Sequence, residues 1–330
     1  MIMNKEDLLV TIIIPTYNAR SFVMDCYKSI SNQTYKNLEI IFVNDCSTDD
    51  SLIVLNKIKR LDSRVKIINL EKNSGVSVAR NIGLENSSGD IIGFCDADDI
   101  IIPTMISEMV KPIISEDVDF TCCGLSFAKA DGSIIERKFD SMVEEFSIEE
   151  AIKYWLEGKK IGNSINTKFL KRSIWMNNSI RFPENEIFEE SFVIPQLILK
   201  SKKIRHVGIN GYRYIRRENS ITTKPFSESK LIVYERERFI KNNVLKKFPN
   251  LKNEYYAFVA RNNKDLYISA ILSANIIERD LYERVKKEFD DIFSKAIFCR
   301  NLSFKDKIKI IELKLRLFEI RKNITGQLFK

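Results

Sequence analysis

The stretch Ile91-Ile92-Gly93-Phe94-Cys95-Asp96-Ala97-Asp98-Asp99 joins five uncharged residues to a cluster of three aspartates. The uncharged part follows Gly89 and Asp90 and has the length and composition of a buried strand. In open α/β sheets, ligands bind in the crevice beyond the carboxyl ends of the strands. The stretch therefore predicts a strand whose acidic end faces a binding site.

The three aspartates allow two interpretations. Asp96 and Asp98, with Asp99 beside them, can share one Mg2+ or Mn2+ ion, which prefers oxygen ligands and often retains phosphate oxygens as its other partners. Alternatively, they are loop and capping residues ahead of a helix that begins near Pro103. The rest of the chain favours the metal site.

The composition is that of a globular protein. With 330 residues, 44% of them hydrophobic, the chain can form one large domain or two modest ones. No apolar run approaches the roughly 20 residues that span a bilayer. The first nine residues include Lys5, Glu6 and Asp7, where a signal peptide needs an apolar core. We therefore expect a cytoplasmic protein, whose six cysteines lack CxxC spacing and are expected to be reduced.

The basic charge is concentrated near the C-terminus. The formal net charge is +8, and residues 300–330 contain nine Lys or Arg against three acids. Apolar residues recur there at helical spacing among lysines, at Phe304, Ile308, Ile311, Leu315 and Phe318. This pattern is typical of a basic amphipathic helix, which can lie on an anionic membrane surface or pack on another helix or a second subunit. No recognition module accompanies the charge, so we do not expect nucleic-acid binding.

Strands and helices alternate over the first third of the chain. Mainly apolar runs, several of them rich in β-branched residues, predict strands at 10–14, 38–43, 65–68 and 91–95, and apolar residues at helical spacing predict helices at 22–33, 52–61 and 76–84. Such alternation predicts a parallel, doubly wound sheet over residues 8–115.

The predicted sheet lacks the usual dinucleotide-binding turn. That turn requires GxGxxG after the first strand, but the sequence here is Pro15-Thr16-Tyr17-Asn18-Ala19, and no GxxxxGK[ST] loop occurs elsewhere. A nucleotide bound without glycine-cradled phosphates needs another way to neutralise its diphosphate, and a metal held by carboxylates provides one.

Residues 10–110 strongly resemble the nucleotide-binding half of inverting family 2 glycosyltransferases with the GT-A fold. The resemblance is carried by five segments in the family's order and spacing: 10–18 (VTIIIPTYN), 29–35 (SISNQTY), 39–49 (EIIFVNDCSTD), 73–83 (NSGVSVARNIG) and the DxD motif at 96–98. Asn44 and Cys46 depart from the family's second-strand motif, but this chain retains the motif's aspartate at Asp45.

The resemblance implies a role for each matched residue. The nucleotide would lie at the loop of Pro15 and Tyr17, with the Tyr17 ring on uracil and Asp45 accepting from its imide. Arg80 would approach the nucleotide, Asp96 would hold the ribose or the metal, and Asp98 would ligate the metal. An aromatic face and an acceptor provide base selectivity, and the divalent ion offsets charge on the departing diphosphate. The implied cofactor is Mg2+ or Mn2+, and the implied donor is a UDP-sugar.

The segment 181–192 resembles the family's acidic pair followed by phenylalanine, so its catalytic base maps onto Glu190, with Glu189 as a competitor. An inverting transfer needs a carboxylate to take the proton of the acceptor hydroxyl. Alternatively, both glutamates only begin a helix that runs through Val193 and Leu197, where acids suit the first turn. Arg216 and Arg217 match a segment of the bacterial surface-polysaccharide members and either clamp phosphate oxygens or form a solvated charged run.

The resulting prediction is an α/β GT-A protein in three parts. Residues 1–115 would bind the nucleotide-sugar, residues 116–225 would bind the acceptor, and residues 226–330 would form a helical region that contacts a membrane surface or a second subunit. The predicted activity is metal-dependent, inverting transfer from a UDP-sugar to a saccharide acceptor linked to polyprenol, in capsule, O-antigen or exopolysaccharide synthesis at the cytoplasmic face of the membrane. A silent nucleotide-sugar-binding or membrane-binding scaffold and a sugar nucleotidyltransferase are the alternatives.

Overall fold

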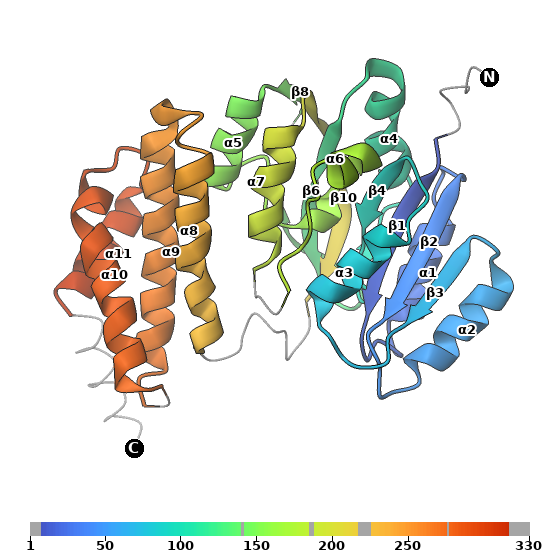
Figure 1. Ribbon diagram of the computed structural model, residues 1–330, viewed down its shortest axis with the longest axis horizontal. Coiled ribbons are helices and arrows are strands. Elements are labelled where there is room, and N and C mark those ends of the chain that lie inside the picture. The colour runs from blue at the N-terminus through green and yellow to red at the C-terminus, as the bar shows by residue number, and fades with distance from the viewer. Residues whose placement is uncertain (1–7, 140–141, 185–187, 217–225, 276, 317–330) are drawn as a thin grey trace. The chain divides into compact units, whose positions relative to one another are not determined.

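The computed structural model describes residues 8–139, 142–184, 188–216, 226–275 and 277–316. The chain divides into two compact units, residues 1–218 and 219–330. The first unit is a mixed α/β structure around one sheet, and the second is built from helices (Figure 1). The predicted class, an α/β fold with a mainly parallel doubly wound sheet and a helical C-terminal region, is confirmed.

The described residues of the first unit form a ten-stranded sheet in the order β3-β2-β1-β4-β9-β6-β10-β5, with β7 on β6 and β8 on β10. The four predicted strands are parallel neighbours, and β9 joins them to the second half of the sheet by pairing antiparallel with both β4 and β6. The strands are β1 Val10–Thr16, β2 Leu38–Asn44, β3 Val65–Asn69, β4 Ile91–Phe94, β5 Ile100–Ile101, β6 Phe120–Ala128, β7 Ile134–Lys138, β8 Val143–Phe146, β9 Lys168–Lys171 and β10 Ile204–Ile215.

The helices of the first unit are α1 Val23–Ser31, α2 Ser51–Leu61, α3 Val76–Glu85, α4 Met105–Glu116, α5 Ile148–Glu157, α6 Arg172–Asn177 and α7 Glu190–Lys200, with the 3-10 turn η2 Ile165–Thr167. Those of the second unit are α8 Ile232–Asn243, α9 Lys252–Leu272, α10 Arg279–Phe298 and α11 Phe304–Lys314, with the 3-10 turns η4 Glu228–Leu231 and η5 Pro249–Leu251.

Strand β1 explains why helices cover both faces of the sheet. Its side chains alternate, so Ile12 and Ile14 enter the core that contains the apolar faces of α1, α2 and α4. Ile13 points to the opposite face, where α3 packs against β1. A Cβ atom on Gly83 would lie 2.3 Å from Ile13 Cγ2, so glycine at this position permits the close approach of α3. This packing holds the carboxyl ends of the strands in fixed positions.

The simple alternation of strand and helix ends after α4. Strands β6 and β7 form an antiparallel hairpin, and the turn between them includes Gly132 with a φ of 83°. Among the described residues, all six cysteines are free, and only Cys46 is not buried. None of the described helices is long and apolar enough to cross a bilayer.

Candidate active site

The carboxyl ends of β1, β2 and β4 bring the predicted nucleotide-binding residues to one edge of the sheet. Tyr17 follows β1 with 49% of its side chain exposed, Asp45 follows β2, and Asp96 lies just after β4. Pro15 lies within β1 and is partly buried. Because these strands are parallel neighbours, the loops after them are adjacent, and the Asp45 backbone N–H donates to the carbonyl of Thr16 at 2.8 Å.

Asp45 shapes the loop ahead of α3. Its carboxylate accepts hydrogen bonds from the backbone N–H groups of Ser74 at 2.7 Å and Gly75 at 2.8 Å. Gly75 has a φ of 89°, which glycine adopts without strain, and α3 begins at the next residue. Each carboxylate oxygen keeps a second lone pair, so Asp45 is still able to accept a hydrogen bond from a ligand.

Arg80 joins the two ends of the predicted site. It extends from α3, is only 3% exposed, and lies 3.2 Å from Asp96 Oδ1, 2.5 Å from Glu189 Oε1 and 3.3 Å from Glu190 Oε1. Burial alone would lower the pKa of Arg80, but the carboxylates of Glu190, Asp96 and Glu189 raise it above its ordinary value. A permanent cation therefore connects the end of β4 to the beginning of α7.

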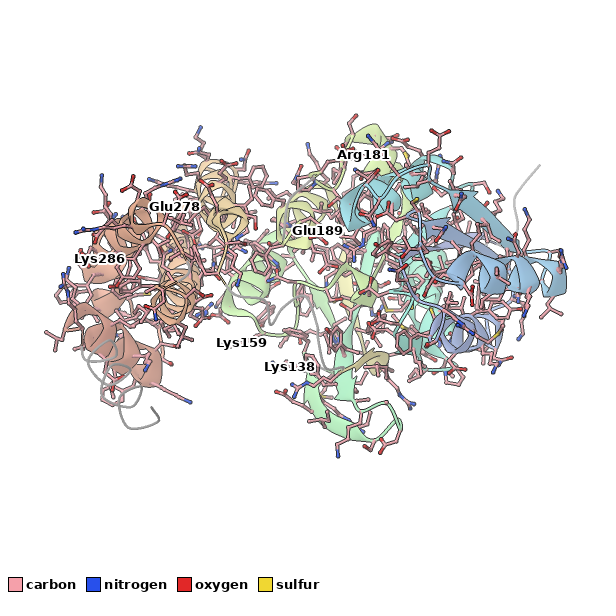
Figure 2. The ribbon with its side chains drawn as sticks, turned by 90° about the horizontal axis from the view of Figure 1, so that it is seen from below. Lys138, Lys159, Arg181, Glu189, Glu278 and Lys286 are labelled. Atoms are coloured by element: carbon pink, nitrogen blue, oxygen red, sulfur yellow. The ribbon has the colours of Figure 1, made fainter. Side chains whose placement is uncertain are left out.

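Both predicted glutamates lie at the start of α7. Glu189, labelled in Figure 2, is the N-cap residue, and Glu190 is the first helical residue. Burial raises the pKa of Glu190 to about 7 against the opposing effect of Arg80, and the charges of Glu189 and Asp96 raise it further. A carboxyl group with a pKa near 7 is well matched to accepting a proton at neutral pH. The two glutamates begin the helix and also converge on Arg80, so the two sequence interpretations are compatible.

The three aspartates after β4 have different environments. Asp99 is buried and accepts hydrogen bonds from the Tyr212 hydroxyl at 2.7 Å and the Ile215 N–H at 2.9 Å, so it ties the segment between β4 and β5 to β10. Burial, with the charges of Asp96 and Asp98, raises the pKa of Asp99 well above its usual range. Asp96 and Asp98 are both partly exposed. Helix α4 begins later with Thr104 at its N-cap, so the aspartates do not cap it.

The predicted arginine pair is only partly described. Arg216 follows β10, pairs with Glu136 at 3.5 Å and lies over the Phe127 ring, 4.7 Å from its centre. Arg217 lies outside the described residues. The ion pair and the ring contact fit the charged-surface interpretation of Arg216.

Two residues that the sequence did not single out complete the cluster. The side-chain amide of Asn166 donates to Asp96 Oδ2 at 2.8 Å and to the Tyr212 hydroxyl at 3.0 Å. The Asp96 N–H in turn donates to the Tyr212 hydroxyl at 3.1 Å. No local pattern around Asn166 indicates this role, because its partners are brought together only by the pairing of β9 with β4.

Carboxylates, an exposed aromatic ring and a partly buried acidic pair thus gather on a mainly parallel sheet, the arrangement that the sequence predicted for a GT-A glycosyltransferase. A profile of the family described as "Glycosyl transferase family 2" matches residues 11–180, which is more than half of the chain. The protein belongs to this family and is a glycosyltransferase.

Similar proteins are bacterial glycosyltransferases. Glycosyltransferase GlyG of Streptococcus pneumoniae is 28% identical over 228 residues, covering 67% of this chain and 75% of GlyG. TuaG of Bacillus subtilis, provisionally named a teichuronic acid biosynthesis glycosyltransferase, is 33% identical over 150 residues, covering 46% of this chain and 59% of TuaG.

Among solved structures, residues 1–349 of TarS from S. aureus in complex with UDP-GlcNAc are similar to this chain, with a TM-score of 0.59 and 19% sequence identity. The similarity covers 86% of this chain and 92% of the TarS chain. At this identity the likeness supports the fold.

Proposed function

We propose that this glycosyltransferase transfers a sugar with inversion from a UDP-sugar to a saccharide acceptor in the synthesis of a bacterial surface polysaccharide. The observation that carries the proposal is the convergence of Asp96, Glu189 and Glu190 on Arg80. It connects a donor-side carboxylate at the end of β4 with a candidate base at the start of α7. Membership of family 2 favours this activity over a silent scaffold and over a nucleotidyltransferase.

In the proposed reaction, the acceptor hydroxyl attacks the anomeric carbon from the face opposite the diphosphate. A new C–O bond forms, the bond from the anomeric carbon to the diphosphate oxygen breaks, and UDP departs with the bonding electrons. Glu190 takes the hydroxyl proton, which its pKa of about 7 favours at neutral pH. Arg80 pairs with both Glu190 and Glu189 and thereby orients the two carboxylates.

The carboxylates fit a divalent metal. Asp96 and Asp98 offer hard oxygen donors. Asp96 Oδ1 accepts a hydrogen bond from Arg80 and Oδ2 accepts one from Asn166, so each oxygen retains a lone pair. The described residues contain no group of three or more acidic, histidine or cysteine side chains able to hold a metal alone. The remaining ligands would therefore be diphosphate oxygens and water, as is usual for Mg2+. When bound, the ion would offset the charge on the departing diphosphate.

The identity of the donor and acceptor is inferred from the relatives. TarS binds UDP-GlcNAc, and TuaG is named for teichuronic acid biosynthesis, a bacterial surface polymer. In this chain, the half-exposed ring of Tyr17 offers a face for uracil, and Asp45 offers an acceptor for its imide. The proposal keeps residues 1–115 as the donor part and residues 116–225 as the acceptor part.

Helix α11 supports a peripheral membrane role at the cytoplasmic face, where a polyprenyl-linked acceptor would be reached. Its apolar residues Phe304, Ile308 and Ile311 are exposed, at 79%, 44% and 40%, and Lys305 and Lys307 lie among them. Phe318, the last member of the predicted stripe, lies outside the described residues. A second copy of the chain is the alternative partner for this face.

The test is calorimetric titration with UDP, GDP and dTDP, each with and without Mn2+. We expect micromolar binding of UDP that is lost on chelation, followed by release of UDP from UDP-sugars by the wild-type protein. Asp98→Asn is the matched variant, since it keeps the shape of the side chain and removes its charge. If no nucleoside diphosphate binds under any metal condition, the proposed donor and metal site are wrong.

A further inference from the structure

The 3-10 turn η2 contacts both sides of the proposed reaction centre. The Ile165 N–H donates to Glu190 Oε1 at 3.2 Å, and on the next residue the Asn166 amide donates to Asp96 Oδ2 at 2.8 Å. On the other side, Arg80 lies 3.3 Å from the same Glu190 oxygen and 3.2 Å from Asp96 Oδ1. These contacts form a closed ring through Arg80, Asp96, η2 and Glu190.

The orientation of the Asn166 amide is fixed by its partners. Its nitrogen donates to Asp96 and to the Tyr212 hydroxyl, and a reversed amide would present its oxygen to the Asp96 carboxylate. Asn166 is only 2% exposed, and its Oδ1 has no hydrogen-bond partner among the described residues. A buried acceptor without a partner costs about 1–3 kcal/mol. Stability alone therefore does not account for an amide at this position.

Lys168 stabilises the 3-10 turn η2. Its ammonium group is buried and donates to the carbonyl of Ser164 at 2.6 Å and to Thr167 Oγ1 at 2.8 Å. The Thr167 hydroxyl also donates to the Ser164 carbonyl, at 2.9 Å. The backbone that carries Ile165 and Asn166 is thus held in one conformation, which is the condition for a turn to position other groups precisely.

We propose that Asn166 is a positioning residue that fixes the Asp96 carboxylate relative to Glu190. The sugar donor at Asp96 and the acceptor hydroxyl whose proton Glu190 takes are then held in one geometry. This inference rests on the proposed function, which assigns Asp96 to the donor and Glu190 to the acceptor. Without the amide, Asp96 loses its partner opposite Arg80 and turns toward that cation, and Arg80 then shifts away from Glu190. Misplacement of about 1 Å is enough to reduce turnover about 100-fold.

The experiment compares Asn166→Ala and Asn166→Asp with the wild-type protein. Asn166→Asp keeps the size of the side chain, removes the N–H that donates to Asp96 and places a negative charge against the Asp96 carboxylate. We expect kcat for UDP release from UDP-GlcNAc to fall about 10- to 100-fold in the alanine variant and further in the aspartate variant, while KM changes by less than about threefold. Thr121→Val is the matched control, because it removes a buried hydroxyl that donates to the carbonyls of Met109 and Phe169 and takes part in none of the contacts of the ring.

A second readout does not depend on turnover. Affinity for UDP with Mn2+ is measured in Asp96→Asn, Asn166→Ala and the double variant, and we expect the loss of up to about threefold that Asn166→Ala causes alone to vanish once Asp96 is changed. Two outcomes would overturn this inference and leave the proposed function standing. One is that the losses of UDP affinity in the two single variants add in the double variant, and the other is that kcat falls no further in Asn166→Ala than in Thr121→Val. A wild-type protein that neither binds UDP nor releases it from a UDP-sugar overturns the proposed function, and the positioning role with it.

Discussion

Replacing Glu190 by glutamine is expected to stabilise the protein at alkaline pH while removing its turnover. The folded protein holds the pKa of Glu190 at about 7, against an ordinary value of 4.5. Because the folded state binds the proton more tightly, stability falls as pH rises from 4.5 through 7. At about 1.4 kcal/mol for each tenfold change in proton affinity, ionised Glu190 costs the folded state about 3 kcal/mol above pH 7. The pKa of about 7 already includes the attraction to Arg80, so glutamine avoids this cost and we expect a gain of up to about 3 kcal/mol at pH 8.

The assay is urea unfolding of both proteins at pH 5 and pH 8, together with UDP affinity and the rate of UDP release. The stability difference should be large at pH 8 and nearly absent at pH 5, and the variant should still bind UDP with Mn2+ while losing most turnover. Glu189→Gln is the matched control, because Glu189 lies on the same turn and also pairs with Arg80. A stability difference independent of pH would refute the charge argument, and full turnover in Glu190→Gln would reject this residue as the base.

Four further changes test other parts of the molecule. Asp98→Ala should abolish transfer and weaken Mn2+-dependent UDP binding at least about tenfold, and unchanged activity would remove Asp98 from the metal site. Tyr17→Ala should weaken UDP binding by about 1–3 kcal/mol in calorimetry whereas Tyr17→Phe should not, if the exposed ring stacks on the base. Glu39 is buried, yet hydrogen bonds from Lys66 and neighbouring groups lower its pKa to about 2. Glu39→Gln should therefore cost about 1–2 kcal/mol in urea unfolding at pH 7, and this loss should shrink as pH falls from 4.5 toward 2. Ile308→Asp should reduce sedimentation with vesicles that contain phosphatidylglycerol, and equal binding by both proteins would exclude α11 as the contact.

The parallel half of the fold could be predicted from sequence because its signals are local. The uncharged run at 10–14 predicted β1 Val10–Thr16, and the run at 38–43 predicted β2 Leu38–Asn44. A strand buried on both faces is apolar along most of its length, so its sequence reveals it without knowledge of its neighbours. The convergence of Tyr17, Asp45 and Asp96 at one edge then followed from the rule that parallel strands end on the same side.

The second half of the site could not be predicted in this way. Strand β9 enters between β4 and β6, and it brings Asn166 to Asp96, 70 residues away along the chain. No periodicity specifies that pairing. Asp99 shows the same limit at short range, since it follows Asp98 directly yet is buried against Tyr212. Its role depends on β10, which the sequence pattern did not place beside β5.

The charges around Arg80 are easier to explain by ligand binding than by stability. One buried guanidinium faces the carboxylates of Asp96, Glu189 and Glu190, so the cluster holds more negative than positive charge. Buried ion pairs contribute little net stability, and an excess of buried carboxylates is unfavourable unless a proton or a cation compensates it. The raised pKa of Glu190 is the protein's own partial compensation. A divalent ion at Asp96 and Asp98 would supply the rest and would lower the proton affinity of Glu190, so donor binding and the readiness of the base are electrostatically linked through Arg80.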